Sequence, residues 1–124
     1  MTIHVIEKQA HLRQLIQLEL SDASLDCFCV ATSDEAHDVL MFEKVDVVVL
    51  GVGWPSQEDL HTLCWLKSFF PDLPIVLFAG EEDLQPKSIA RLADVWVEKS
   101  SRIDLLLVEI QRFKQKMPLR LLTP

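Results

Sequence analysis

Glycine is scarce in this sequence and occupies three of its 124 positions, Gly51, Gly53 and Gly80. Proteins that bind phosphate groups commonly do so with glycine-rich loops, because a backbone without side chains can approach the phosphate closely. The chain contains no GxxxxGKS or GxxxxGKT motif, no GxGxxG motif and no GxSxG turn of a hydrolase. These absences argue against a nucleotide-dependent enzyme or a serine hydrolase, and we expect no enzymatic activity.

Cysteine and histidine are also few, and their spacing fits no metal site. The three cysteines, Cys27, Cys29 and Cys64, are an odd number without CxxC spacing or an adjacent histidine pair. We expect them to be reduced thiols in the core of a cytoplasmic protein. The histidines show no metal spacing and no serine or cysteine partner, so we expect all four at the surface: His4, His11, His37 and His61. No metal ion, cofactor or catalytic residue is predicted.

The chain has neither an excess of positive charge nor a long hydrophobic run. Its net charge is −7, so nucleic acid and anionic membrane surfaces would repel it. No apolar stretch approaches the roughly 20 residues that span a bilayer. The first residues lack the basic region and long apolar segment of a signal peptide. We therefore expect a cytoplasmic protein that contacts neither nucleic acid nor membrane directly.

Five short apolar runs, each followed by a helical pattern, are what the sequence does contain. Strands are predicted over residues 3–6, 25–31, 46–50, 74–79 and 93–98, and helices are predicted between and after them. The unbroken valines of the third run favour a strand buried on both faces. The repeats predict an α/β fold, a doubly wound five-stranded parallel sheet of flavodoxin-like order 2-1-3-4-5 in three α/β/α layers.

Local signals place the helix ends. The first helix is predicted over residues 10–20, and Thr32 or Ser33 can cap the second. The third begins near Ser56 and stops before Pro71. Pro86 suits the first turn of the fourth, Ser101 can cap the last, and Met117-Pro118 ends it. One domain thus covers residues 1–117, and residues 118–124 are a tail or the start of a linker to an effector domain.

Helical spacing also predicts which side chains face the core. In the second helix we expect Ala36, Val39 and Leu40 to point inward, with Met41 and Phe42 widening the same apolar stripe. In the fourth helix we expect Ile89 and Leu92 to point inward. In the last helix the inward face is continuous: Ile103, Leu106, Leu107, Ile110 and Phe113.

The third apolar run and its sequel, Val45-Asp46-Val47-Val48-Val49-Leu50-Gly51-Val52-Gly53-Trp54-Pro55, resemble the middle of a CheY-like receiver domain of response regulators. The resemblance extends over roughly residues 3–116. In that family this strand ends on the aspartate that accepts a phosphoryl group, and a proline follows four residues later. Here the proline is Pro55, but Gly51 holds the acceptor position and has no side chain to phosphorylate. The resemblance implies a receiver fold without the family's chemistry.

Other positions of the family's phosphorylation pocket differ as well. The family's two adjacent acidic residues, which hold magnesium, are Glu7 and Lys8 here, and its threonine or serine after the fourth strand is Ala79. Lys99 matches the family's basic residue, although Ser100 replaces the proline that normally follows. Phosphoryl transfer needs an acceptor, a divalent cation and hydrogen-bond donors. The resemblance therefore implies a degenerate pocket formed by Glu7, Lys8, Gly51, Ala79 and Lys99.

Two lysines in this pocket have alternative interpretations. The Lys8 ammonium either fills the vacant metal position, within ion-pair reach of Glu7, or is an ordinary solvated lysine. Lys99 is either a second ion-pair partner for Glu7 or an ordinary lysine at a strand end. The segment between Ala79 and Lys99 is slightly short for the family, which would trim the fourth helix.

The resemblance also implies a signalling face on the fourth helix, fifth strand and fifth helix. This face would include Arg91, Trp96, Glu98 and Arg102, and would contact a protein partner or a second copy of the chain. Trp96 stands where the family usually keeps an aromatic residue that switches rotamer, but a packed strand residue is an equal alternative. Trp54 is expected in an exposed loop.

The function implied is a phosphorylation-independent regulatory module that acts through protein contact or dimerisation, as the amino-terminal domain of a longer transcriptional regulator. The alternative is a small-molecule-binding or enzymatic domain that reuses the vacated pocket. A deep pocket lined by Lys8, Gly51, Ala79 and Lys99 would favour that alternative, whereas a filled one would favour the regulatory module.

Overall fold

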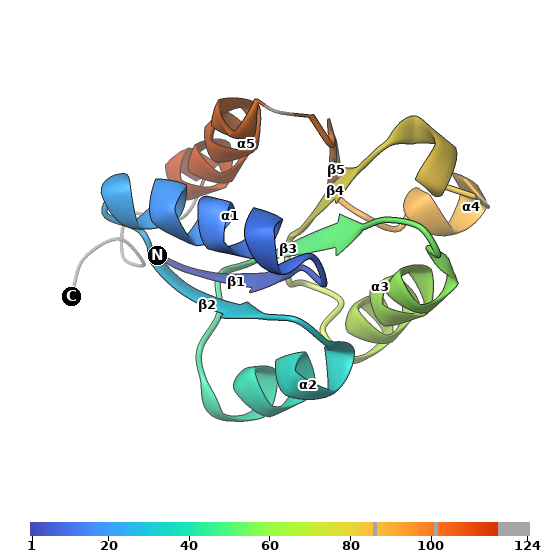
Figure 1. Cartoon of the computed structure of the whole chain (residues 1–124). Helices are drawn as coiled ribbons and strands as arrows, with labels where there is room; N and C mark the ends of the chain where they lie inside the picture. Colours follow the sequence, from blue (N-terminus) through green and yellow to red (C-terminus); the bar gives the residue numbers. More distant parts are fainter. Residues whose placement is uncertain (86, 101, 117–124) are drawn as a thin grey trace.

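A parallel sheet of five strands runs through the centre of the molecule, in the order β2-β1-β3-β4-β5, with helices on both of its faces (Figure 1). The computed structural model describes residues 1–85, 87–100 and 102–116. The sheet confirms the predicted fold class and strand order. The positions predicted to start or end the last two helices, Pro86, Ser101 and Met117-Pro118, lie outside the described residues, as does the tail at 118–124.

The elements follow one another in the order that the apolar runs predict, with one short 3-10 helix, η1, added before α4. Their bounds are β1 Thr2–Ile6, α1 Ala10–Asp22, β2 Asp26–Val30, α2 Ser33–Phe42, β3 Val47–Val52, α3 Gln57–Phe69, β4 Ile75–Ala79, η1 Glu81–Asp83, α4 Lys87–Ala90, β5 Val95–Glu98 and α5 Ile103–Lys116. None of the helices in the described ranges combines the length and apolarity that crossing a bilayer requires.

The sheet separates two apolar cores, and β3 contributes to both. Val47 and Val49 pack on the side covered by α1 and α5, while Val48 and Leu50 pack on the side covered by α2 and α3. All six residues of β3 are buried, which confirms the prediction drawn from its unbroken valines. Because burial of one such side chain contributes about 1.5 to 3 kcal/mol, this strand anchors both layers.

The second helix, α2, begins at the predicted cap, but its buried face is narrower than predicted. The Thr32 hydroxyl accepts a hydrogen bond from the Glu35 backbone amide at 3.2 Å and so caps α2 as predicted. Met41 and Phe42 are exposed, however, so the prediction that they widen the apolar stripe is wrong. Phe42 lies about 200° round the helix axis from Leu40 and therefore points away from the sheet.

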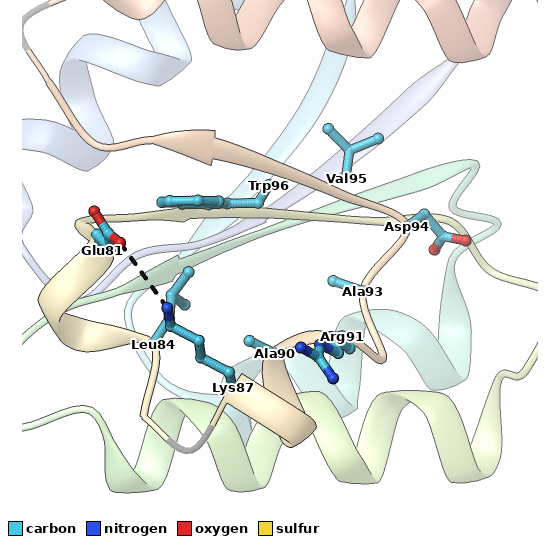
Figure 2. Close-up of a pocket in the computed structure, with 9 residues that line it drawn as sticks. All are labelled: Glu81, Leu84, Lys87, Ala90, Arg91, Ala93, Asp94, Val95 and Trp96. Atoms are coloured by element: carbon cyan, nitrogen blue, oxygen red, sulfur yellow. Dashed lines mark ion pairs between the residues drawn. The ribbon is translucent and has the colours of Figure 1, made fainter.

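The fourth helix is a single turn, as the short segment before Lys99 predicts. Ile89 packs against the core as expected, but Leu92 is exposed, contrary to the prediction. The reason is that α4 ends at Ala90, so helical spacing no longer relates Leu92 to Ile89. With so little helix above it, β5 borders a groove rather than a packed helix (Figure 2).

His4 is buried, although a surface position was predicted for it. The other three histidines are exposed, but His4 is fully buried in β1, and the prediction of a surface position is wrong. The strand is covered on both faces, so no position in its centre faces water. Nδ1 lies 3.0 Å from the Phe28 carbonyl oxygen, while Nε2 has no hydrogen-bond partner among the described residues. Burial lowers the pKa of His4, and the backbone of Phe28 and Ala36 opposes that shift only in part.

The cysteines are free thiols, as expected, but all three are half-buried and not fully within the core as predicted. Cys27 and Cys29 share one face of the edge strand β2, against the core under α1. Desolvation, followed by the neighbouring Cys27, raises the pKa of the Cys29 thiol to about 12. A thiol with so high a pKa is a poor nucleophile and a poor metal ligand at neutral pH.

His4 should make the stability of the domain depend on pH. Its pKa is lowered from the ordinary value of 6.5, so below that pH the unfolded chain binds more protons than the folded one. Stability is therefore complete above pH 6.5 and is lost as the pH falls toward the lower pKa of the folded state. His4→Leu should remove this loss, whereas His11→Leu, at an exposed site, should not. Urea unfolding at pH 7.5 and 5.0, each about one unit or more from the ordinary value, checks both; parallel pH profiles for wild type and His4→Leu would contradict the account.

Candidate functional site

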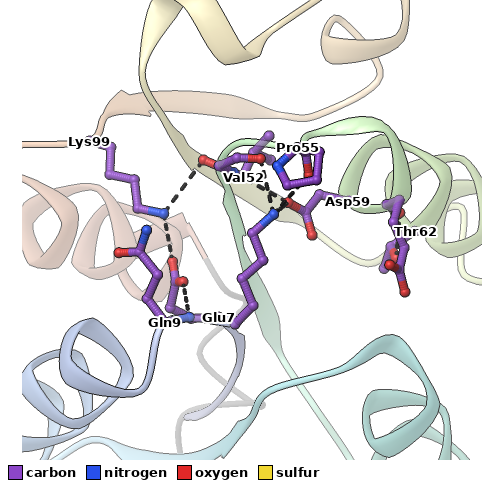
Figure 3. Close-up of polar contacts among 10 residues, drawn as sticks. Glu7, Gln9, Val52, Pro55, Asp59, Thr62 and Lys99 are labelled. Atoms are coloured by element: carbon purple, nitrogen blue, oxygen red, sulfur yellow. Dashed lines mark hydrogen bonds and ion pairs between the residues drawn. The ribbon is translucent and has the colours of Figure 1, made fainter.

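The carboxyl edge of the sheet gathers the residues of the predicted degenerate pocket. Glu7 and Lys8 directly follow β1, Gly51 lies within β3, Ala79 ends β4 and Lys99 follows β5. Parallel strands all end at the same edge, which is why residues distant in sequence meet here. The charged residues form two separate ion pairs: Glu7 pairs with Lys99 (Figure 3), and Lys8 pairs with another residue.

The Glu7 carboxylate is buried and neutralised by Lys99. Lys99 Nζ lies 2.9 Å from Glu7 Oε1, and the glutamate side chain has no exposed surface. Glu7 Oε2 accepts a hydrogen bond from the Gln9 backbone amide at 2.8 Å. Oε1 faces the ammonium but has no well-aligned donor. A buried carboxylate without a counter-ion would be costly, so the Lys99 ammonium compensates the burial of the Glu7 side chain. The interpretation of Lys99 as an ion-pair partner of Glu7 is confirmed.

Gly51 leaves the space that the glutamate fills. A Cβ atom at position 51 would overlap Glu7 Oε1 and would lie 2.8 Å from Glu7 Cδ, closer than real Cβ atoms approach a neighbour. The backbone of Gly51 needs no unusual conformation, since no glycine among the described residues has a positive φ. Glycine at this position leaves room for the Glu7 carboxylate because it has no side chain. The carboxylate at this place comes from Glu7, and the pocket around Gly51 is filled.

Lys8 forms a second ion pair, away from Glu7. Its Nζ lies 3.0 Å from Asp59 Oδ2 and donates to the carbonyl oxygens of Gly53 at 3.0 Å and Pro55 at 2.8 Å. The ammonium thus uses three donors on three oxygens, so Lys8 is not a freely solvated lysine. The interpretation that it pairs with Glu7 is also wrong. Lys8 lies in a bend after the end of β1, and its ammonium is taken up by Asp59 and by the loop after β3 instead of by Glu7.

Asp59 is a site residue that the sequence reasoning missed. It lies in the first turn of α3, where a carboxylate is favoured by the helix dipole. Its Oδ2 atom also accepts a hydrogen bond from the Gly53 backbone amide at 3.2 Å, so it fixes both the loop after β3 and the Lys8 ammonium. An acidic first turn was the available signal, but Asp59 lies 51 residues from Lys8, and only the folded chain brings them together.

The charges of this site balance. Two carboxylates, of Glu7 and Asp59, are matched by two ammonium groups, of Lys99 and Lys8. In the part of the chain that the structure describes, no group of three or more histidine, cysteine, aspartate or glutamate side chains is placed to hold a metal ion. A groove of about 410 Å³ lies beside Lys8 and Asp59, but Gly51, Ala79 and Lys99 do not line it.

Trp96 connects this edge of the sheet to the surface. Its indole Nε1 donates a hydrogen bond of 2.9 Å to the carbonyl oxygen of Ala79, while 47% of its surface remains exposed. The other residues of the predicted signalling face are exposed too, and Arg102 pairs with Asp104 at 2.8 Å. Trp54 is an exposed loop residue, as predicted, with 87% of its surface accessible.

The chain is similar in sequence to transcriptional regulators. No family model matches the chain. It is 25% identical over 118 residues to the transcriptional regulatory protein PhoP of Escherichia coli O157:H7, covering 94% of this chain and 53% of PhoP. It is 26% identical over 102 residues to the phosphate regulon regulator PhoB of Pseudomonas aeruginosa, covering 79% of this chain and 44% of PhoB. The chain thus spans about half or less of the length of these curated relatives.

Solved receiver structures share the fold. The receiver domain of NtrX from Brucella abortus superimposes with a TM-score of 0.81 at 23% identity, covering 93% of this chain and 99% of that one. TrrA from Thermotoga maritima, solved in complex with Mg²⁺ and BeF, gives 0.80 at 20% identity, covering 90% and 97%. The structural neighbours and the relatives together support a receiver domain of the response-regulator type.

Gly51→Ala should destabilise the domain, because its Cβ would displace the buried Glu7 carboxylate from its place beside Lys99. We expect a loss of about 1 to 3 kcal/mol in the free energy of unfolding, measured in urea. Gly53→Ala is the matched control, since a Cβ there would meet its nearest atoms at an ordinary 3.6 Å. Equal effects of the two substitutions would show that Glu7 does not fill the space at Gly51.

Removing Lys8 should leave the partly buried Asp59 carboxylate and two carbonyl groups without their donor. We expect Lys8→Ala to lower the free energy of unfolding by about 1 to 3 kcal/mol, against less than about 0.5 kcal/mol for the exposed Lys44→Ala. Lys8→Asp should lose more, and magnesium should restore part of that loss. Thermal melts with and without magnesium check this; wild-type stability in both Lys8 variants would contradict it.

Proposed function

We propose that the chain is a degenerate receiver domain that works as a phosphorylation-independent regulatory module through contact with a protein partner or a second copy of itself. One observation carries this proposal: the Glu7 side chain, paired with Lys99, occupies the space above Gly51 in which an acceptor side chain would stand. The charged groups at this edge of the sheet are already paired with one another, so the module needs neither magnesium nor a phosphoryl group to neutralise them.

The chemistry of phosphoryl transfer supports the proposal. That reaction depends on positioned charges that neutralise the phosphoryl oxygens and on an acceptor aligned with them. In this site both ammonium groups already have carboxylate partners, at 2.9 and 3.0 Å, and Ala79 offers no hydroxyl donor. An incoming phosphoryl group would have to break these pairs without gaining a covalent acceptor.

The exposed side chains of β5 and α5 suit a protein contact. Trp96, Leu105 and Val108 are large apolar residues with about half of their surface exposed, and the exposed Arg102–Asp104 pair lies at the start of α5. Protein interfaces commonly combine an aromatic anchor with a polar rim. We propose that this surface, with Arg91 and Glu98, contacts the partner.

The length of the relatives supports a larger assembly. PhoP and PhoB are transcriptional regulators by name, and this chain matches about half of each. We propose that the chain is the amino-terminal domain of a transcriptional regulator in the cytoplasm and that it binds neither DNA nor membrane itself. Reuse of the vacated pocket for a ligand or for catalysis is disfavoured because Glu7 fills the space at Gly51.

The protein should not become phosphorylated. Incubation with acetyl phosphate and magnesium should give no acid-labile phosphoprotein by mass spectrometry, and beryllofluoride should not shift its NMR spectrum. Gly51→Asp alone should not restore labelling, because the Lys8 ammonium opposes binding of the metal and Ala79 supplies no hydroxyl donor. An active receiver domain serves as the positive control. Magnesium-dependent labelling of either wild type or Gly51→Asp would overturn the proposal.

Trp96→Ala should weaken association through the proposed surface. An aromatic anchor lost from the centre of an interface raises the Kd by about tenfold or more. Sedimentation velocity over a concentration series measures self-association, and titration with the effector region measures the intramolecular contact. Trp54→Ala is the control, since that indole is exposed in the loop after β3. Unchanged association in Trp96→Ala would exclude this surface.

A further inference from the structure

A groove of about 390 Å³ lies between α4 and β5, away from the ion pairs described above (Figure 2). Its walls are largely apolar and include Leu84, Ala90, Ala93, Val95 and Trp96. The groove exists because α4 is one turn long and because two alanines stand where larger side chains would fill the space. The volume falls in the range of small-molecule sites, which are mostly apolar with a few placed polar groups.

The aromatic wall of this groove is fixed. The Trp96 indole is held by its hydrogen bond of 2.9 Å to the Ala79 carbonyl oxygen, so the ring cannot turn to close the space without losing that bond. Binding to a wall that is already in place requires little ordering of the protein, which favours affinity. The half-exposed indole is therefore available as a flat apolar surface for a bound molecule.

The charged groups at the rim are not equivalent. Asp94 is occupied, since its Oδ2 atom lies 2.9 Å from Lys67 Nζ and accepts from the Ile75 amide at 2.7 Å. Lys87 and Glu81 form a long, exposed pair at 3.9 Å, a kind of contact that contributes little. Arg91 makes no ion pair with any residue in the described part of the chain. The rim thus carries one unmatched guanidinium, of Arg91 just after α4, and the weakly held ammonium of Lys87 at the start of α4.

The ends of the groove limit what can enter it. In Figure 2 the Glu81–Lys87 pair stands at one end, and Ala93 and Asp94 stand at the other. This shape suits a short molecule better than a peptide that would have to run through it. We propose that the groove binds a small amphiphilic carboxylate, with its apolar part against Trp96 and the aliphatic walls and its carboxylate on Arg91. Guanidinium and carboxylate are complementary in shape as well as charge.

The site lies on the same surface as the proposed partner contact, because Trp96 belongs to both. A bound acid would alter the apolar surface offered to the partner, so the ligand could supply a signal that the locked pocket at Gly51 cannot receive. That regulatory consequence rests on the proposed function, whereas binding itself does not. The two are separable by experiment, since probe binding is measured on the isolated chain without any partner.

Two-dimensional NMR of the whole chain tests the proposal, with phenylbutyrate and octanoate as probes and phenylbutanol and octanol as neutral counterparts. We expect saturable shifts of the Trp96 indole and of the Ala90 and Ala93 amides with both acids, while the Trp54 and Trp65 indoles stay in place. Arg91→Gln should weaken binding of the acids by about tenfold and leave the alcohols unaffected. Lys44→Gln removes the same charge at an exposed position before β3, away from the groove, and is the control that should change neither.

Filling the groove gives an independent check. Ala93→Leu should abolish binding of all four probes, with Ala90→Leu as the second filling variant if the first fails to fold. Absence of saturable shifts for either acid up to its solubility would overturn the proposal, as would equal losses for acids and alcohols in Arg91→Gln. Shifts centred on Trp65 would place the site elsewhere and exclude it. Groove signals that move on dilution without a probe would show that a second copy of the chain occupies it.

Discussion

The ion pair between Glu7 and Lys99 is the interaction on which the carboxyl edge of the sheet depends. Glu7 follows β1 and Lys99 follows β5, and two strands, β3 and β4, lie between those strands in the sheet. The pair therefore spans the ends of the central strands, and it can do so because Gly51 puts no side chain in the way. Breaking a buried pair by removing one partner typically costs about 3 to 5 kcal/mol, so the three positions constrain one another.

The second ion pair extends the same constraint to the loop after β3. Lys8 binds two carbonyl groups of that loop and the first turn of α3 through Asp59. The chain thus supplies from its own side chains the cations and anions that this edge of the sheet holds. A site whose charges are satisfied internally gains little by binding an ion from solution, whereas a site with an excess of one sign does gain. The balanced charges of the two ion pairs and the filled space at Gly51 both support the proposed role that does not depend on phosphorylation.

Much of the fold could be predicted because burial leaves a local signature. The valines of β3 indicate a strand covered on both faces, and Thr32 or Ser33 indicates the start of a helix; the strand is buried and Thr32 is the cap. The wrong predictions arise where helical spacing is extended past the end of a helix, or where a polar residue is assumed to lie at the surface. Leu92 lies after the end of α4, and His4 is polar yet occupies the centre of a doubly covered strand. The site was harder to predict than the fold. Glu7, Gly51 and Lys99 lie together as expected, but the partner of Lys8 is Asp59, and only tertiary packing brings those two residues into contact.

The single turn of α4 has a consequence for the dynamics of the domain. A helix of four residues forms too few internal hydrogen bonds to repay its own nucleation, so this turn persists only through the side chains that dock it. Ile89 and Ala90 provide that docking and are only partly buried. Segments of this kind open at a small fraction of the global free energy of unfolding. We therefore expect the amide hydrogens of α4 to exchange sooner than those of the longer helices, and this short helix borders the groove beside Trp96.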